Sequence, residues 1–398
     1  MNGVKMIIVD EISMVSANIL TTINGRLGVV AERQNAELFG GKIILVLGDF
    51  YQIPPVGAKS LLEAALEGVS GGDLFRQFKV IFLKTQVRAR EEQQKKLINM
   101  FLSGEVHRDF KPRYLQRHDI ECNGFDSATF LVLTNIERSA INKCFAAINA
   151  ARNGKNVFFW RKNILGASAA QIDHALHREL SEKVPDMLGW FMEGANCVCL
   201  NNFNPACGLA NGSFCIFRGV VPATEACREK LQAQGDGSVM EIEQPRYLLL
   251  EPEATSIDAA IPGVMFNGRK CVVIGTTNEE VRLTKKKISV ASHMVDFRYA
   301  LTIHKCQGKT LGKVVVCIDK ASQRGGASFE QLLVACTRVT TNEDLRFMPP
   351  FQGKNHDYIY GLKIKPFIKE WFFGNFSEDG FRNYFGEIGR AIARERNP

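Results

Sequence analysis

The chain has 398 residues, of which 45% are hydrophobic and 23% charged, and its net charge is +8. Such a composition is that of a globular protein of roughly two or three domains. Apolar runs stay short of the ~18 to 20 residues that a bilayer span requires, and no charged-then-apolar leader opens the chain, so we expect a soluble intracellular protein. The basic charge permits a polyanionic partner without establishing one.

The eleven cysteines lack the spacing of a small disulfide scaffold, which favours reduced thiols. The evidence for a metal site among four of the cysteines is weak, because their spacing contains no C-x2-C knuckle, and we do not expect zinc there. These four are Cys197, Cys199, Cys207 and Cys215.

Two apolar runs near the amino terminus, 4–9 and 43–47, each lead into acidic residues. Such runs are typical of strands buried on both faces of a parallel sheet. The stretch between them has apolar residues at helical spacing, which predicts a strand, helix, strand unit. Polar residues at the carboxyl ends of such strands share one edge of the sheet. The residues predicted at this edge are Asp10, Glu11, Asp49 and Gln52.

A strand ending in Asp10-Glu11 is typical of a Walker B motif. In that interpretation Asp10 holds Mg²⁺ and Glu11 polarises the attacking water of a nucleotide triphosphate. Gln52, just past the second strand, would touch the terminal phosphate. The alternative is that Asp10-Glu11 only caps the following helix, but the second motif at 48–56 favours the nucleotide site.

Further along, the pattern predicts an α/β protein with an inserted small β-barrel. An apolar run at 80–83 predicts a strand, 129–133 predicts another, and 139–151 predicts a helix. Many short strands separated by Gly and Pro follow, and α/β alternation then resumes. The predicted segments are 1–82 (first α/β domain), 83–196 and 297–346 (second α/β domain), 197–296 (barrel) and 347–398 (tail).

Six motifs occur in a characteristic order: Asp10-Glu11, 48–55, 83–88, 208–212, 300–310 and 335–339. This order resembles that of the Pif-type DNA helicases, the RecD-like branch of superfamily one, over residues 4–346. The resemblance implies two RecA-like parallel-sheet domains, the first incomplete, with the barrel inserted. It also implies ATP and Mg²⁺ as cofactors, 5′ to 3′ movement on single-stranded DNA, unwinding at DNA junctions, and work in DNA repair and recombination.

The resemblance also implies roles for residues that match the motifs. Glu11, Gln52, Arg88 and Arg338 would be catalytic, with the two arginines reaching the transferring phosphate when domains close. A surface salt bridge is the alternative for each arginine. The nucleotide and its metal would be bound by Asp10, Gln52, Arg88, Gln307, Gly308 and Arg338.

A second group of matching residues would contact the DNA backbone, where lysines and small polar groups need no particular base. For Thr134 and Asn135 an ordinary helix N-cap is an equal alternative. The predicted DNA-binding residues are Thr134, Asn135, Asn142, His304 and Lys305.

One departure from the family is the phosphate-binding pattern G-x-x-x-x-G-K-[ST]. Its only partial match is Gly308-Lys309-Thr310, and Ile303 stands where the first glycine is required. We therefore expect a chain truncated before the Walker B strand, with sheet edge and apolar surface exposed in 1–82. The causes left open are a truncated gene model and a degenerate or mobile-element-derived copy of the gene.

Three functions remain open at this point. The first is a Pif-type helicase that is inactive as this chain alone. The second is a non-catalytic remnant that binds single-stranded nucleic acid, and the third is an unrelated α/β nucleotide-binding enzyme. The compartment would be nuclear or mitochondrial in a eukaryote and cytoplasmic otherwise.

Overall fold

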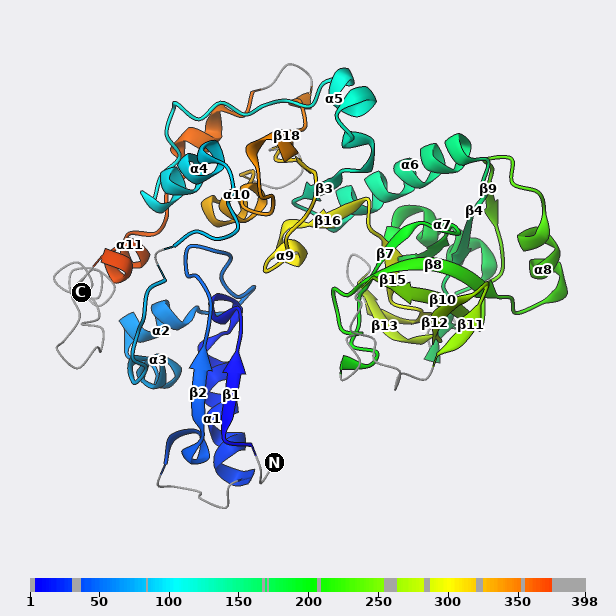
Figure 1. The fold of residues 1–398 in the computed structure, drawn as a ribbon. Helices are drawn as coiled ribbons and strands as arrows, with labels where there is room; N and C mark the ends of the chain where they lie inside the picture. Colours follow the sequence, from blue (N-terminus) through cyan, green and yellow to red (C-terminus); the bar gives the residue numbers. More distant parts are fainter. Residues whose placement is uncertain are drawn as a thin grey trace. The chain divides into compact units, whose positions relative to one another are not determined.

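The computed structural model divides the chain into two compact units (Figure 1). Unit 1 comprises Met1–Asp126 and Cys306–Pro398, and unit 2 comprises Ser127–Lys305. Within the described ranges, every helix is too short or too polar to span a lipid bilayer. The structure describes residues 4–30, 37–83, 85–166, 169, 172–205, 209–253, 263–282, 287–319, 325–351 and 355–373.

The amino-terminal part of unit 1 has two strands with a helix between them, followed by two short helices: β1 (Met6–Val9), η1 (Ile12–Met14), α1 (Ala17–Val30), η2 (Leu38–Gly41), β2 (Ile43–Val46), α2 (Leu61–Glu67) and α3 (Ser70–Arg76). β1 and β2 are parallel and in register, as Figure 1 shows. The helix α1 buries Leu20 and Leu27. The predicted strand, helix, strand unit is confirmed.

The prediction that these two strands are buried on both faces is wrong. Met6 and Ile8 of β1 are 49% and 59% exposed, and Ile43 of β2 is 60% exposed. Alternate residues of each strand are half-buried, because successive side chains point to opposite faces of a sheet. One face of the pair therefore presents apolar side chains to solvent, as we expected for residues 1–82.

The rest of unit 1 is mainly helical and contains a second parallel strand pair, β17 with β18. Its elements are α4 (Glu92–Leu102), α5 (Arg117–Cys122), η3 (Phe125–Ser127), β17 (Val314–Val316), α10 (Phe329–Cys336), η7 (Asn342–Asp344), β18 (Leu345–Phe347), η9 (Asp357–Gly361) and α11 (Pro366–Phe373). Every residue of α10 is buried, and a capping box between Ser328 and Gln331 fixes its start. Arg338 follows this helix.

Residues 80–83 form no strand, contrary to the prediction. Ile81 and Leu83 are 87% and 91% exposed. Phe82 instead joins an aromatic cluster, with its ring centroid 5.5 Å from that of Trp371 and 5.3 Å from that of Phe372. The helix α11 of the tail therefore packs within unit 1.

Unit 2 combines α/β elements with antiparallel sheet: β3 (Thr129–Val132), α6 (Asn135–Asn153), β4 (Val157–Arg161), β5 (Ile164–Leu165), α7 (His174–Lys183), η5 (Pro185–Met187), β6 (Leu188–Phe191), β7 (Asn196–Cys199), β8 (Phe214–Val221), α8 (Glu225–Gln232), β9 (Val239–Glu241), β10 (Tyr247–Pro252), β11 (Val264–Phe266), β12 (Arg269–Ile274), β13 (Thr277–Arg282), β14 (Lys287–Ser292), β15 (Val295–Phe297), β16 (Ala300–Thr302) and α9 (Ile303–Cys306). β3 and β16 are parallel, and α6 follows β3. The predicted strand and helix at this place are confirmed.

Six strands of unit 2 form one sheet in the order β11-β12-β10-β8-β7-β15. Figure 1 shows these strands curving together, with α6 and α8 outside them. The buried core includes Trp160, Phe217 and Phe297. A closed barrel stays a prediction, because β11 and β15 end the sheet without pairing with each other.

The cysteine group lies partly within this core. Cys197, Cys199 and Cys215 are fully buried, and the Sγ atoms of Cys199 and Cys215 are 3.7 Å apart. Cys207 lies outside the described residues. Among the described residues, no group of three or more His, Cys, Asp or Glu side chains is arranged to hold a metal ion.

Candidate functional site

The carboxyl ends of β1 and β2 meet at Glu11 and Gly48. Ile12 N donates a 2.8 Å hydrogen bond to Leu47 O, which binds the two strand ends together. A Cβ at position 48 would lie 2.8 Å from Ile12 N, so this approach requires glycine. Glu11 has a left-handed backbone with φ 52°, a conformation that is uncommon for residues other than glycine and concentrates at functional sites.

The Glu11 carboxylate is bound by the motif at 300–310. Gln307 Nε2 donates to Glu11 Oε2 at 2.9 Å and to Ser13 Oγ at 3.1 Å. Gly308 has φ +75°, and a Cβ there would lie 2.9 Å from Glu11 Oε1. Two motifs nearly 300 residues apart in sequence are thus in direct contact within unit 1.

Asp49 and Gln52 lie on the loop that follows β2. Asp49 accepts hydrogen bonds from Tyr51 N at 2.9 Å and from Gln52 Nε2 at 3.3 Å. Burial raises the pKa of Asp49, and the nearby Glu11 carboxylate adds to the rise, while Arg338 opposes it. The buried Gln52 Oε1 has no hydrogen-bond partner among the described residues. This oxygen is a free acceptor on the residue that was predicted to touch the terminal phosphate.

Arg338 is buried, with 1% of its surface exposed. Its Nε donates to Val334 O at 2.9 Å and its Nη2 donates to Thr337 Oγ1 at 2.8 Å. Burial lowers the pKa of Arg338 to about 10, while the Glu11 and Asp49 carboxylates oppose that fall, so the guanidinium stays charged at neutral pH. The side chain makes no ion pair with any described residue, and the surface salt-bridge alternative therefore does not apply to it.

Arg88 lies next to Arg338 in this arrangement. Its Nε donates to Thr310 Oγ1 at 3.1 Å, and its Nη1 donates to Thr337 O at 3.3 Å. Both arginines therefore contact Thr337, one through the carbonyl and one through the hydroxyl. The charge of Arg88 also contributes to lowering the pKa of Arg338. Two like charges placed together favour an anion between or beside them.

The side chains at this site match some of the requirements for binding a nucleotide with Mg²⁺. Asp10 is exposed, and its Oδ1 accepts from Glu11 N at 2.8 Å, which leaves Oδ2 available for a metal. Mg²⁺ is commonly bound through one or two carboxylates together with phosphates and waters, so a single aspartate fits that role. Arg88 and Arg338 supply cations for phosphate. The amides and lysine of a phosphate loop have no counterpart in the 398 residues.

The residues predicted to contact DNA through α6 are engaged within unit 2. Thr134 caps α6, accepting from Glu137 N and donating to the Glu137 carboxylate, as in the N-cap alternative. Asn135 Oδ1 accepts from Arg138 Nη1. Asn142 is 2% exposed, donates to Phe297 O at 2.9 Å and accepts from Ala300 N at 2.7 Å. A DNA role for these three residues stays a prediction.

His304 and Lys305 lie on α9 and are half-buried. Burial lowers the pKa of both side chains, and the neighbouring Arg138 lowers that of Lys305 further. Sequence reasoning missed Arg138, whose Nε lies 3.2 Å from Asp296 Oδ2 and whose Nη2 lies 3.5 Å from Asp186 Oδ1. No local pattern signals this cluster, because its members are far apart in the chain.

Comparison with known proteins shows similarity to helicases. Residues 1–103 match the PIF1-like helicase family, and residues 264–344 match the viral superfamily 1 RNA helicase core domain. The chain is 23% identical over 387 residues to the ATP-dependent DNA helicase PIF1 of Emericella nidulans, covering 86% of this chain and 47% of that relative. The chain is similar to the Pif-type helicases of superfamily one. It spans about half the length of this Pif-type relative.

Solved structures of Pif-type helicases share the fold. The Pif1 helicase of Candida albicans aligns with a TM-score of 0.55 at 19% identity, over 92% of this chain and 76% of that one. A Bacteroides Pif1 helicase, in complex with ADP-AlF3 and ssDNA, aligns with a TM-score of 0.50 at 16% identity, over 91% and 72%. These likenesses, with the parallel strand pairs, confirm the predicted α/β, RecA-like fold class.

Proposed function

We propose that this Pif-type chain carries part of the machinery of an ATP-driven DNA helicase. The observation that carries the proposal is the contact of the Glu11 carboxylate with Gln307, beside the buried guanidinium of Arg338. It is supported by the name of the Emericella nidulans relative and by the Bacteroides Pif1 complex with nucleotide analogue and ssDNA. The full activity would be 5′ to 3′ translocation on single-stranded DNA with unwinding at junctions. It would take place in a compartment that contains DNA: the nucleus or mitochondrion of a eukaryote, or the cytoplasm otherwise.

The chemistry would be hydrolysis of the terminal phosphate of ATP with Mg²⁺ as counter-ion. Asp10 would hold the metal through its free oxygen. Glu11, fixed by Gln307, would orient and deprotonate water, and Gln52 would touch the terminal phosphate. Arg88 and Arg338 would stabilise the charge that builds on the phosphate.

We also propose that the domain boundaries of the chain lie after residues 82, 196, 296 and 346.

The second candidate is a single-stranded nucleic-acid-binding remnant without hydrolysis. The 398 residues contain no complete G-x-x-x-x-G-K-[ST] pattern, which supplies the phosphate cradle. We expect the 398-residue chain alone to hydrolyse ATP negligibly. A coupled-phosphate assay of the chain and of Glu11→Gln checks this. Robust turnover that disappears in Glu11→Gln would contradict the expectation and favour the complete motor.

The DNA part of the proposal predicts salt-sensitive binding of single strands. Replacing Lys305 by alanine removes a cation that would contact a phosphate, and the salt slope should fall by about 0.7. Filter binding of an oligonucleotide across a salt series measures this slope. Lys287→Ala is a matched control, because Lys287 lies in the same unit but pairs with Glu280 at 2.7 Å. Indifference of binding to both Lys305→Ala and salt would count against the DNA role.

A further inference from the structure

A cavity of about 370 Å³ opens in unit 1 between α4, the coil that leads to α5, and β18. Its floor is apolar: Leu97 and Phe347 are buried, and the half-buried Phe110 packs its ring on Phe347 at a centroid distance of 5.9 Å. None of the residues assigned to the nucleotide or the DNA lines this cavity. A space of this size accommodates a small ligand or one unit of a polymer.

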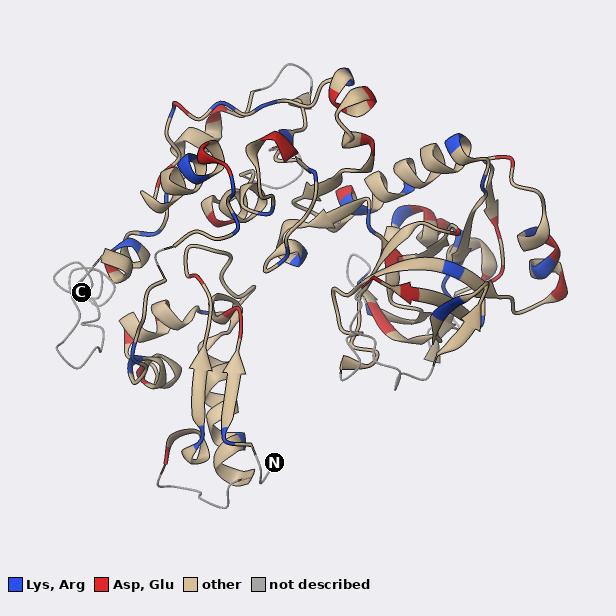
Figure 2. Ribbon diagram, in the orientation of Figure 1, with Lys and Arg blue, Asp and Glu red and all other residues tan. Residues whose placement is uncertain are grey.

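Cations surround the mouth of the cavity. The exposed side chains of Lys96, Lys111 and Arg113 line it, with Asp109 as the one carboxylate of the lining. Figure 2 shows blue stretches recurring along the coil between α4 and α5. Among the described residues, no ion pair involves Lys96 or Lys111, while the Lys111 ammonium lies 5.9 Å from the Tyr360 ring centroid. Neither lysine charge is therefore neutralised by an ion pair, and Asp109 supplies a single opposing charge.

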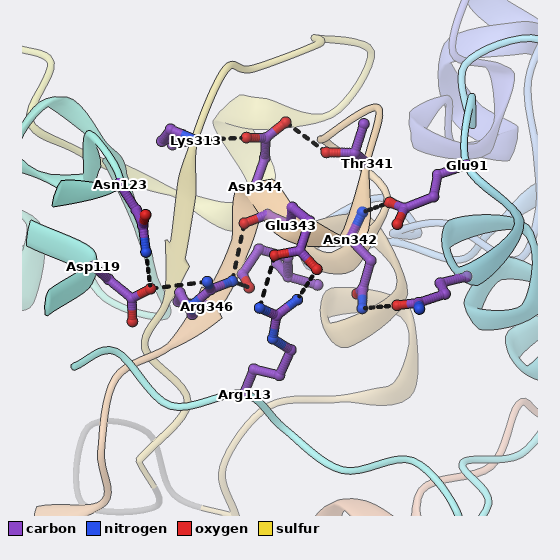
Figure 3. Close-up of polar contacts among 12 residues, drawn as sticks. Glu91, Arg113, Asp119, Asn123, Lys313, Thr341, Asn342, Glu343, Asp344 and Arg346 are labelled. Atoms are coloured by element: carbon purple, nitrogen blue, oxygen red, sulfur yellow. Dashed lines mark hydrogen bonds and ion pairs between the residues drawn. The ribbon is translucent and has the colours of Figure 1, made fainter.

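Hydrogen bonds hold the wall of the cavity in place (Figure 3). Arg113 makes two hydrogen bonds to the Glu343 carboxylate, at 2.6 and 2.8 Å. Asn342 N donates to Glu91 Oε2 at 2.8 Å, which ties the wall to the start of α4. The Glu343 charge is thus neutralised by Arg113, and it does not cancel the field of the two lysines.

A further pair of carboxylates behind the wall is neutralised in the same way. Asp344 accepts from Lys313 at 2.7 Å, and Asp119 accepts from Arg346 at 2.8 Å, as Figure 3 shows. The net field at the mouth of the cavity is therefore positive. A ligand that suits it carries negative charge at the rim and a flat apolar group for the floor.

We propose that this cavity binds a segment of single-stranded nucleic acid, with phosphates at Lys96 and Lys111 and a base against Phe110. The inference rests on the proposed function and adds to it a second strand-binding site, separate from Lys305. A nucleotide unit combines the required anion and flat apolar surface, and stacking of a base on an aromatic ring tolerates any sequence. An acidic peptide would also supply the negative charge. It would stack a ring on Phe110 only if an aromatic residue followed its carboxylates.

The test measures anisotropy of a fluorescein-labelled oligo-dT at several salt concentrations. In Lys96→Gln/Lys111→Gln, two phosphate contacts are lost, so affinity should fall and the salt slope should decrease by about 1.4, at about 0.7 for each contact. The control Lys95→Gln/Arg117→Gln removes the same charge from neighbouring positions that are paired with Glu92 and Glu121. It should change the slope by much less. Unchanged thermal melting of both variants would show that they fold.

A cross-linking arm locates the strand directly. An oligonucleotide with 5-bromodeoxyuridine, irradiated in the complex, should label the peptide that contains His107 and Phe110, and the double variant should abolish that label. Equal slopes in the two double variants, or an acidic peptide that binds through Lys96 and Lys111 where oligo-dT does not, would overturn the proposal. If Lys305→Ala weakens binding and Lys96→Gln/Lys111→Gln does not, the proposal for this cavity is contradicted and the proposed function stands. If the unaltered chain binds no oligonucleotide at all, both fail.

Discussion

Replacing Arg346 by alanine is expected to lower the free energy of unfolding by about 3 to 5 kcal/mol, because it leaves a buried carboxylate without its partner. Arg346 and Asp119 are 5% and 6% exposed, and Arg346 Nη2 donates to Asp119 Oδ1 at 2.8 Å. The guanidinium also lies 4.8 Å from the ring centroid of Phe125. Urea unfolding followed by circular dichroism measures the loss.

The matched control is Arg113→Ala. Arg113 also binds a carboxylate through two hydrogen bonds, but its side chain and that of Glu343 are 40% and 62% exposed. Exposed pairs contribute about 0 to 1 kcal/mol, so this variant should stay close to the unaltered protein. Similar losses in both variants would show that burial does not set the strength of the Arg346 pair.

The same pair predicts a dependence on pH. The hydrogen bond from Arg346 lowers the pKa of Asp119 to about 2 from an ordinary value of 3.8. Because the unfolded chain then binds the proton more readily, this stabilisation is complete above about pH 5 and is lost as the pH falls through 4 towards 2. It amounts to about 2 kcal/mol. The difference in unfolding free energy between Arg346→Ala and the unaltered protein should therefore narrow by about 2 kcal/mol between pH 6 and 2, and a difference that stays constant would contradict the assignment.

Sequence reasoning succeeded where the signal was local. The apolar runs at 4–9 and 43–47 and the periodic stretch between them predict β1, β2 and α1, since side-chain spacing reports secondary structure directly. The rule that strand ends share an edge placed Glu11 near Asp49, and in the structure the Glu11 carboxylate contributes to raising the pKa of Asp49. The order of motifs then indicated which distant segments carry the arginines.

It failed where the partner of a residue lies far along the chain. The run at 80–83 satisfies the pattern of a strand, yet Phe82 packs on Trp371 and the run has no neighbouring strand. The sequence also does not report that the amide of Asn142 bonds to Phe297 and Ala300, more than 150 residues away, and its DNA contact stays a prediction. Such contacts are set by tertiary packing, which no window of sequence reports.

Trp371→Ala is expected to destabilise unit 1 by about 3 to 5 kcal/mol, the usual cost of removing a large buried aromatic side chain. Trp371 is 5% exposed, and its ring centroid lies 5.2 Å from that of Phe50 and 5.5 Å from that of Phe82. Removing the indole leaves a void among these rings that backbone shifts fill only in part. Urea unfolding gives the change in free energy.

Phe373→Ala is the control, because Phe373 lies on the same helix and is 68% exposed. A surface truncation of this kind should change stability by no more than about 0.5 kcal/mol.

A second measurement concerns the loop that carries Gln52, since Phe50 and Tyr51 contact Trp371 and Phe372. Amide hydrogen exchange at Tyr51 and Gln52 should accelerate in Trp371→Ala and not in Phe373→Ala. Unchanged exchange in both, despite a loss of stability, would mean that α11 supports the fold without positioning this loop.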